Sequence, residues 1–221
     1  MKEKINELNA KEEYTFEDLQ NIMRILRSPE GCPWDREQDH KSIRKNFIEE
    51  TYEVAEAIDT DNPVLLCEEL GDVMMQVVFH TEMEREVGRF EMSDVMNGVC
   101  KKLIHRHPHV FGNVSADTPE KVLANWDAIK KEEKGQKSVG DVLSSVPVTL
   151  PALMRAQKMI KKAAKSGEKI CENGAEFDGF SCEEYAEILM KICESAARCG
   201  VDLEEILDKR CTDTVNIYKK S

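Results

Sequence analysis

One stretch of 39 residues, from Asn46 to Glu84, contains eleven Asp or Glu residues and neither Lys nor Arg. A long acidic run usually forms a solvated surface, but the positions here favour another interpretation. On a helical wheel at about 100° per residue, one apolar stripe consists of Ile43, Phe47, Val54 and Ile58. Glu50 falls inside that stripe, and Glu53 flanks it. A carboxylate on a core-facing stripe is costly unless its charge is compensated. Because no basic residue is near in the sequence, a metal ion is a good candidate.

The next expected helix is hydrophobic over most of its circumference. Its apolar positions are Leu66, Leu70, Val73, Met74, Val77 and Val78. This coverage predicts a helix that is buried nearly all round. One narrow polar stripe remains on it, made of Glu69, Asp72, Gln76 and His80.

The two helices are joined by the short segment Asp59–Pro63, so we expect antiparallel neighbours whose polar positions face each other. The facing set is an E-x-x-E pair and an E-x-x-D pair, namely Glu50, Glu53, Glu69 and Asp72. Four carboxylates without a soft ligand suit Mg²⁺ or Mn²⁺ rather than zinc. A di-iron carboxylate bundle is the nearest rival, but it requires Glu-x-x-His on its ligand helices. The E-x-x-H of this chain, Glu37 to His40, lies outside both helices.

Start and stop residues divide the chain into helices. Thr15 with Asp18 and Ser181 with Glu184 are capping boxes, and Asn62-Pro63 is typical of an N-cap followed by the first helical residue. Helices are expected over about 16–27, 42–59, 63–88, 93–107, 118–134 and 152–165, with two more after 181. Residues 135–150 are typical of a linker, and 167–179 of irregular structure. Aromatic residues make up only 6% of the chain and strand-like alternation is scarce, so we predict an all-α helical bundle.

Charge and hydropathy exclude several classes of protein. The formal charge is −12, with 43 acidic against 31 basic residues, which disfavours nucleic-acid binding. No apolar run approaches the length of a membrane span, and the polar first residues do not form a signal peptide. The eight cysteines are scattered without a C-x-x-C pair, so free thiols and a cytoplasmic location are expected.

A weak internal repeat is also visible. The segment Glu68–Met75 aligns with Glu183–Met190, so the C-terminal part is either a shortened second copy of one helical unit or a chance match between amphipathic helices.

Several of these strings resemble the MazG family of all-α nucleoside triphosphate pyrophosphohydrolases. Glu49-Glu50-x-x-Glu53 followed by Glu69-x-x-Asp72 is similar to the metal motif of that superfamily. The flanking strings are more specific: L-R-S-P-E-G-C-P-W-D from Leu26, R-H-P-H-V-F-G from Arg106, and Trp126 followed by Lys130. The resemblance implies a catalytic module at 14–137, a linker at 138–151 and a truncated second module at 152–221.

The resemblance also implies an activity, the Mg²⁺-dependent hydrolysis of nucleoside triphosphates to a monophosphate and pyrophosphate, with Mn²⁺ as a possible substitute. The implied metal ligands are Glu50, Glu53, Glu69 and Asp72, with Glu49 as a further ligand or as the base that activates water.

Substrate binding would fall to basic and aromatic residues downstream. Lys102 and Arg106 are placed to neutralise the outer phosphates, although their spacing alone fits a solvated basic face equally well. His105 departs from the family, which usually has Arg there. Trp126 is a candidate for stacking on the base, its alternative role being core packing, and Lys130 completes the expected set.

The C-terminal region departs further from the family pattern. No second E-E-x-x-E helix follows in 161–179, and Glu184-x-x-Glu187 stands where E-x-x-D is expected. A catalytically weak nucleotide-binding regulator is therefore the alternative to an enzyme. A homodimer or higher oligomer is expected, because a small bundle leaves one face of the apolar helix uncovered. The base and sugar preference and the physiological role stay open.

Overall fold

The structure is a computed structural model, which describes residues 1–133, 135–171 and 177–220. These residues form helices and no strand, so the prediction of an all-α fold is confirmed. Two compact units are present, Met1–Val114 and Ser115–Ser221. None of the described helices combines the length and the apolar character that crossing a membrane requires.

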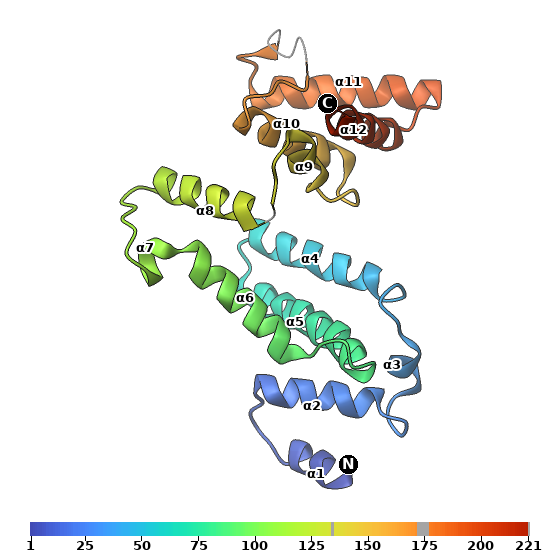
Figure 1. Ribbon diagram of the computed structural model, residues 1–221. Coiled ribbons are helices and arrows are strands. Elements are labelled where there is room, and N and C mark those ends of the chain that lie inside the picture. Colours follow the sequence, from blue (N-terminus) through green and yellow to red (C-terminus); the bar gives the residue numbers. More distant parts are fainter. Residues whose placement is uncertain (134, 172–176, 221) are drawn as a thin grey trace. The chain divides into compact units, whose positions relative to one another are not determined.

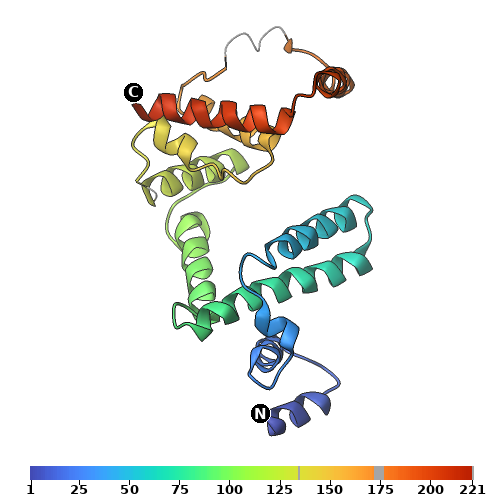
Figure 2. The ribbon, with the colours of Figure 1, turned by 90° about the vertical axis from the view of Figure 1, so that its right-hand side faces the viewer.

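The first unit holds seven helices within its residues, all of them described. They are α1 (Lys2–Asn9), α2 (Phe16–Arg27), α3 (Pro33–Glu37), α4 (Arg44–Asp59), α5 (Pro63–Glu86), α6 (Met92–Arg106) and α7 (Pro108–Phe111). Helices α4 and α5 run side by side as an antiparallel hairpin, which Figures 1 and 2 show from two directions.

Local sequence explains why the α4–α5 hairpin forms. Asn62 caps α5, because its side-chain oxygen accepts a hydrogen bond from the Leu65 amide at 3.1 Å, and Pro63 is the first helical residue. The predicted N-cap is thus confirmed. The reversal before it uses Asp61 at a φ of 49°, a left-handed conformation that Asp tolerates better than most residues.

The core of the first unit lies at the C-terminal half of α5. Its buried members are Met23, Ile43, Val78, Phe79, Met83 and Met92. At the N-terminal half, by contrast, Val64 is 77% exposed, Leu70 51% and Met74 43%. The prediction that this helix is buried nearly all round is therefore wrong for the single chain, because in its N-terminal half the face that packs against α4 is covered while these apolar residues remain exposed.

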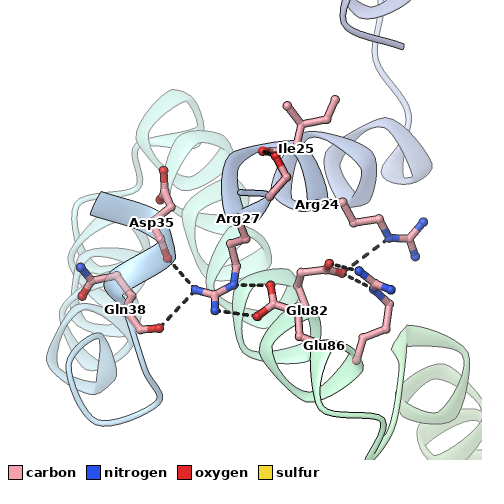
Figure 3. A network of polar contacts seen from close by, with 9 residues as sticks. Arg24, Ile25, Arg27, Asp35, Gln38, Glu82 and Glu86 are labelled. Atoms are coloured by element: carbon pink, nitrogen blue, oxygen red, sulfur yellow. Dashed lines mark hydrogen bonds and ion pairs between the residues drawn. The ribbon is translucent and has the colours of Figure 1, made fainter. Parts of the chain in front are cut away.

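Arg27 joins three elements of the first unit, as Figure 3 shows. Its Nε and Nη2 donate to the carboxylate of Glu86 on α5 at 2.7 and 2.8 Å. Its Nη1 donates to the backbone carbonyls of Asp35 and Gln38, at 2.5 and 3.2 Å. The planar guanidinium can make these bonds at once, so it fixes the segment that leads from α3 into α4.

Gly31 lies in the turn between α2 and α3. A Cβ at this position would lie 2.1 Å from the carbonyl oxygen of Ile25 and 2.3 Å from that of Leu26. Only glycine fits against the end of α2 here, because the atoms it approaches are backbone.

The second unit holds the other helices of the described chain. They are α8 (Pro119–Glu133), α9 (Val139–Ser144), α10 (Ala152–Lys165), α11 (Cys182–Cys199) and α12 (Leu203–Lys220). Its core contains Leu143, Val146, Met159, Ala163, Cys211 and Val215. In Figure 1, α9 and α10 lie beside α12, in agreement with their contacts.

The second unit corrects the expected linker. Residues 138–151 contain helix α9, opened by a capping box of Ser138 and Asp141, and contribute the fully buried Leu143 to the core. Helix α9 is too short for its apolar residues to show a clear helical periodicity in the sequence. The compact units also divide at Val114, within the module expected at 14–137. Of the segment expected to be irregular, 167–179, residues 172–176 lie outside the described residues.

Candidate metal centre

Three carboxylates from the α4–α5 hairpin converge on one point. Glu50 on α4 and Glu69 and Asp72 on α5 each place a carboxylate oxygen within 4.8 Å of the other two. Glu69 is buried at 8% exposure, and Glu50 and Asp72 are half-buried. The helical repeat explains the meeting, because Glu69 and Asp72 are one turn apart on the face of α5 that packs against α4.

Glu53 lies beside this group. It is exposed, and its side chain is hydrogen-bonded to those of both Glu50 and Glu69. The four residues predicted as metal ligands from the sequence are thus neighbours in space, while Glu49 is exposed on α4.

Burial and mutual repulsion disfavour the simultaneous ionisation of all four carboxyl groups of this cluster. Burial raises the pKa of Glu50, and the negative charges of Asp72 and Glu53 raise it further. Burial likewise raises the pKa of Glu69, followed by the charge of Glu53 and the hydrogen bond with it. Each carboxyl group therefore holds its proton more tightly than an isolated one. A divalent cation would relieve this repulsion, and an all-oxygen donor set suits Mg²⁺ or Mn²⁺.

Gln76 extends the cluster by one turn of α5. It is 5% exposed and donates a hydrogen bond to the Glu50 carboxylate, which lowers the pKa of that group. Its Oε1 is fully buried and has no hydrogen-bond partner among the described residues. The sequence placed Gln76 on the polar stripe, but nothing in its spacing marked it as a member of the site.

A histidine pair continues the polar stripe of α5. The Nδ1 atoms of His40 and His80 are 2.7 Å apart, and their rings are stacked with centroids 5.0 Å apart. The Nε2 of His40 lies 2.5 Å from the carboxylate of Glu84, which also pairs with Arg89 at 2.6 Å. Sequence reasoning missed this network, because His40 and His80 are far apart along the chain.

The residues expected to bind substrate divide between the two units. Lys102 and Arg106 lie one turn apart near the end of α6, with Lys102 exposed and Arg106 half-buried. Trp126 and Lys130 are half-buried on α8, in the second unit. The carboxylates and the α8 residues therefore belong to different compact units.

The acidic pair in the second unit has other contacts. Glu184 is the N3 residue of the capping box, where it accepts a hydrogen bond from the Ser181 amide at 2.7 Å. Glu187 pairs with Lys191 at 2.9 Å, and that hydrogen bond holds its pKa below the usual range. Both carboxylates thus serve helix α11 locally. The predicted capping box is confirmed.

Known proteins resemble this chain over most of its length. The model of the MazG nucleotide pyrophosphohydrolase domain matches residues 38–111, which include the whole α4–α5 hairpin. The nucleoside triphosphate pyrophosphohydrolase/pyrophosphatase MazG of Thermotoga maritima is 40% identical over 93% of this chain and 84% of that protein. The nucleoside triphosphate pyrophosphohydrolase of Escherichia coli K12 is 48% identical over 91% of this chain and 76% of that protein. The uncharacterized protein YabN of Bacillus subtilis is 46% identical over 67% of this chain and 30% of that protein. By its α4–α5 hairpin and by these identities, the chain belongs to the MazG family of nucleoside triphosphate pyrophosphohydrolases.

Proposed function

We propose that this chain hydrolyses nucleoside triphosphates, ribo- or deoxyribo-, to the nucleoside monophosphate and pyrophosphate, and that the reaction depends on Mg²⁺. The observation that carries the proposal is the convergence of Glu50, Glu69 and Asp72 within 4.8 Å on the part of the chain that matches the family domain. The names of the Thermotoga and Escherichia relatives support the same reaction.

The residues that would hold the metal are Glu50, Glu53, Glu69 and Asp72. When bound, Mg²⁺ (or Mn²⁺) neutralises phosphate charge and polarises the attacked phosphorus. Without such compensation, the acidic cluster would repel a triphosphate. Repulsion between its own members adds to the burial that raises the pKa values of Glu50 and Glu69.

The protein side chains then have separate tasks. The oxygen of a water molecule forms a bond to the phosphorus that stays in the nucleoside monophosphate. The α–β anhydride bond breaks, and its electron pair leaves with pyrophosphate. Glu49, exposed and directly before Glu50 in the sequence, accepts the proton of the attacking water. Lys102 and Arg106 bind the outer phosphates, because their positive charges offset the charge of the leaving group.

A second copy of the chain is part of this proposal. The residues Val64, Leu70 and Met74 form an apolar, exposed part of the N-terminal half of α5 that no other helix of the unit covers. An uncovered apolar helix face of this kind is suited to a second subunit, so we propose a homodimer that pairs these hairpins.

The test is pyrophosphate release from a mixture of nucleoside triphosphates. Full-length protein is incubated with and without Mg²⁺, and pyrophosphate is measured by a coupled assay. Release that requires Mg²⁺ and stops on adding a chelator is expected. Nucleotide binding without any release would instead favour the alternative of a non-catalytic regulator.

A further inference from the structure

Gln76 has one hydrogen-bonding atom without a partner in a buried position. The residue is 5% exposed, and its Oε1 is one of the few fully buried side-chain oxygens or nitrogens of the described chain that lack a partner. Buried polar groups are almost always hydrogen-bonded, to protein or to ordered water. The structure therefore leaves this carbonyl oxygen available for a small ligand.

The position of Gln76 on α5 directs it to the carboxylates. It follows Glu69 by seven residues and Asp72 by four, so at about 100° per residue its direction is within about 20° of that of Glu69 and 40° of that of Asp72. Its hydrogen bond to Glu50 shows that the side chain reaches across to α4. Gln76 is thus the next member of the stripe that carries the cluster.

The orientation of the amide follows from its neighbour. A carboxylate only accepts hydrogen bonds, so the NH₂ group of Gln76 must face Glu50. In the reversed orientation the carbonyl oxygen would face that carboxylate, and two acceptors would repel each other. With NH₂ on Glu50, the Oε1 points away from Glu50 and remains free to accept a hydrogen bond.

We propose that Gln76 is a positioning residue of this site, whose NH₂ group holds the Glu50 carboxylate while its carbonyl oxygen accepts a hydrogen bond from a water molecule at the carboxylate cluster. This inference rests on the proposed function, since it assigns Gln76 to the same metal site. The Gln76 side chain thus has two roles. Its NH₂ group fixes the direction of the Glu50 carboxylate, and its carbonyl oxygen holds a water molecule beside the ligands.

The test begins with metal binding to the full chain, without substrate. Mn²⁺ is titrated into metal-free protein, and free Mn²⁺ is followed by its electron paramagnetic resonance signal. In Gln76→Met, which keeps the length of the side chain but removes both polar atoms, Mn²⁺ affinity should fall 10- to 100-fold, as for other residues that orient a metal ligand. Met74→Leu, on the exposed face of the same helix, is the matched control and should bind as wild type.

Gln76→Glu separates positioning from charge. It keeps an acceptor oxygen and adds a carboxylate, but it loses the donor to Glu50. Mn²⁺ affinity should therefore hold or increase, while kcat falls 10- to 100-fold. A residue that served packing alone would not give opposite effects on affinity and turnover. If Gln76→Met does not fold, Gln76→Glu decides the question alone.

The outcomes separate this inference from the proposed function. Folded Gln76→Met protein that binds Mn²⁺ within twofold of wild type would overturn the positioning role and leave the metal site standing. So would Gln76→Glu protein with unchanged kcat. Wild-type protein that binds no Mn²⁺ would overturn both proposals.

Discussion

The carboxylates of Glu50 on α4 and Glu69 on α5 lie within 4.8 Å of each other, although 18 residues separate them along the chain. Both groups have raised pKa values, chiefly because both are shielded from water. Two neighbouring carboxyl groups that each resist ionisation do not stabilise the α4–α5 hairpin. Their arrangement makes physical sense as a site that a cation completes.

The first prediction concerns the ligands themselves. Asp72→Asn, and separately Glu53→Gln, should abolish turnover, because each removes a charge that would hold the metal. Without metal, the thermal stability of either variant should hold or rise, since a repulsive charge is lost. Circular dichroism melting and pyrophosphate release measure the two effects. Wild-type activity in either variant would defeat the metal assignment.

The second prediction concerns the acidic pair on α11. Changing Glu184 and Glu187 together to Gln should leave kcat close to wild type, because these carboxylates serve a helix cap and an ion pair with Lys191. A modest loss of stability, about 1 kcal/mol, is expected from the weakened cap. If activity instead falls as far as in Glu53→Gln, the second unit takes part in catalysis.

The third prediction uses the capping box of α2. The Thr15 amide donates to the Asp18 carboxylate at 2.8 Å, and Lys11 pairs with it at 2.6 Å. Chiefly through the Lys11 hydrogen bond, and then through Thr15, the pKa of Asp18 is lowered to about 2. A lowered folded-state pKa contributes stability above the unfolded value of 3.8, and this stability is lost as the pH falls toward 2.

Asp18→Asn should therefore be less stable than wild type at neutral pH. The difference between wild type and Asp18→Asn in the free energy of unfolding, measured with urea, should become smaller as the pH is lowered from 4 toward 2. A gap that stays constant over this range would show that the ionised carboxylate is not what stabilises the cap.

The fourth prediction compares two glycines. Gly31→Ala should destabilise the protein by about 1–3 kcal/mol, because the new methyl group would press on the Ile25 carbonyl and the backbone must move. Gly98→Ala, inside α6 with nothing within 4 Å of the added Cβ, should stabilise it by about 0.5–1 kcal/mol. Equal melting temperatures for the two variants would contradict this account of the turn.

The fifth prediction concerns assembly. Light scattering on the full chain should give a dimer or a higher oligomer. Val64→Glu should weaken this association between chains, because a charge on the exposed apolar face of α5 resists burial. Lys4→Glu, on exposed α1, is the control and should leave the assembly intact. A wild-type chain that is monomeric at all concentrations would contradict the pairing of hairpins.

Much of the fold was readable from local patterns. The Thr15 capping box, the Asn62 N-cap and the Ser181 capping box all lie where the sequence predicts them, because these bonds join residues only three apart. Helix α9 was missed, since six residues carry too little periodicity to be told from a linker. Its capping box of Ser138 and Asp141 is the local signal that could have revealed it, and it packs against α10 and α12.

The site shows the same division. The neighbourhood of the four carboxylates followed from the helical repeat and one short turn. The role of Arg27 and the contact of His40 with His80 depend on how distant segments fold together. No spacing rule reveals such contacts. The exposure of the N-terminal half of α5 was likewise beyond sequence reasoning, because periodicity shows that a face is apolar but not what covers it.

Product analysis tests the central claim most directly. Wild-type protein and Asp72→Asn are each incubated with a nucleoside triphosphate and Mg²⁺, and the products are identified by ³¹P nuclear magnetic resonance. The account predicts nucleoside monophosphate and pyrophosphate in equal amounts from the wild type and neither from Asp72→Asn. Formation of nucleoside diphosphate and inorganic phosphate, or equal turnover by the two proteins, would contradict it.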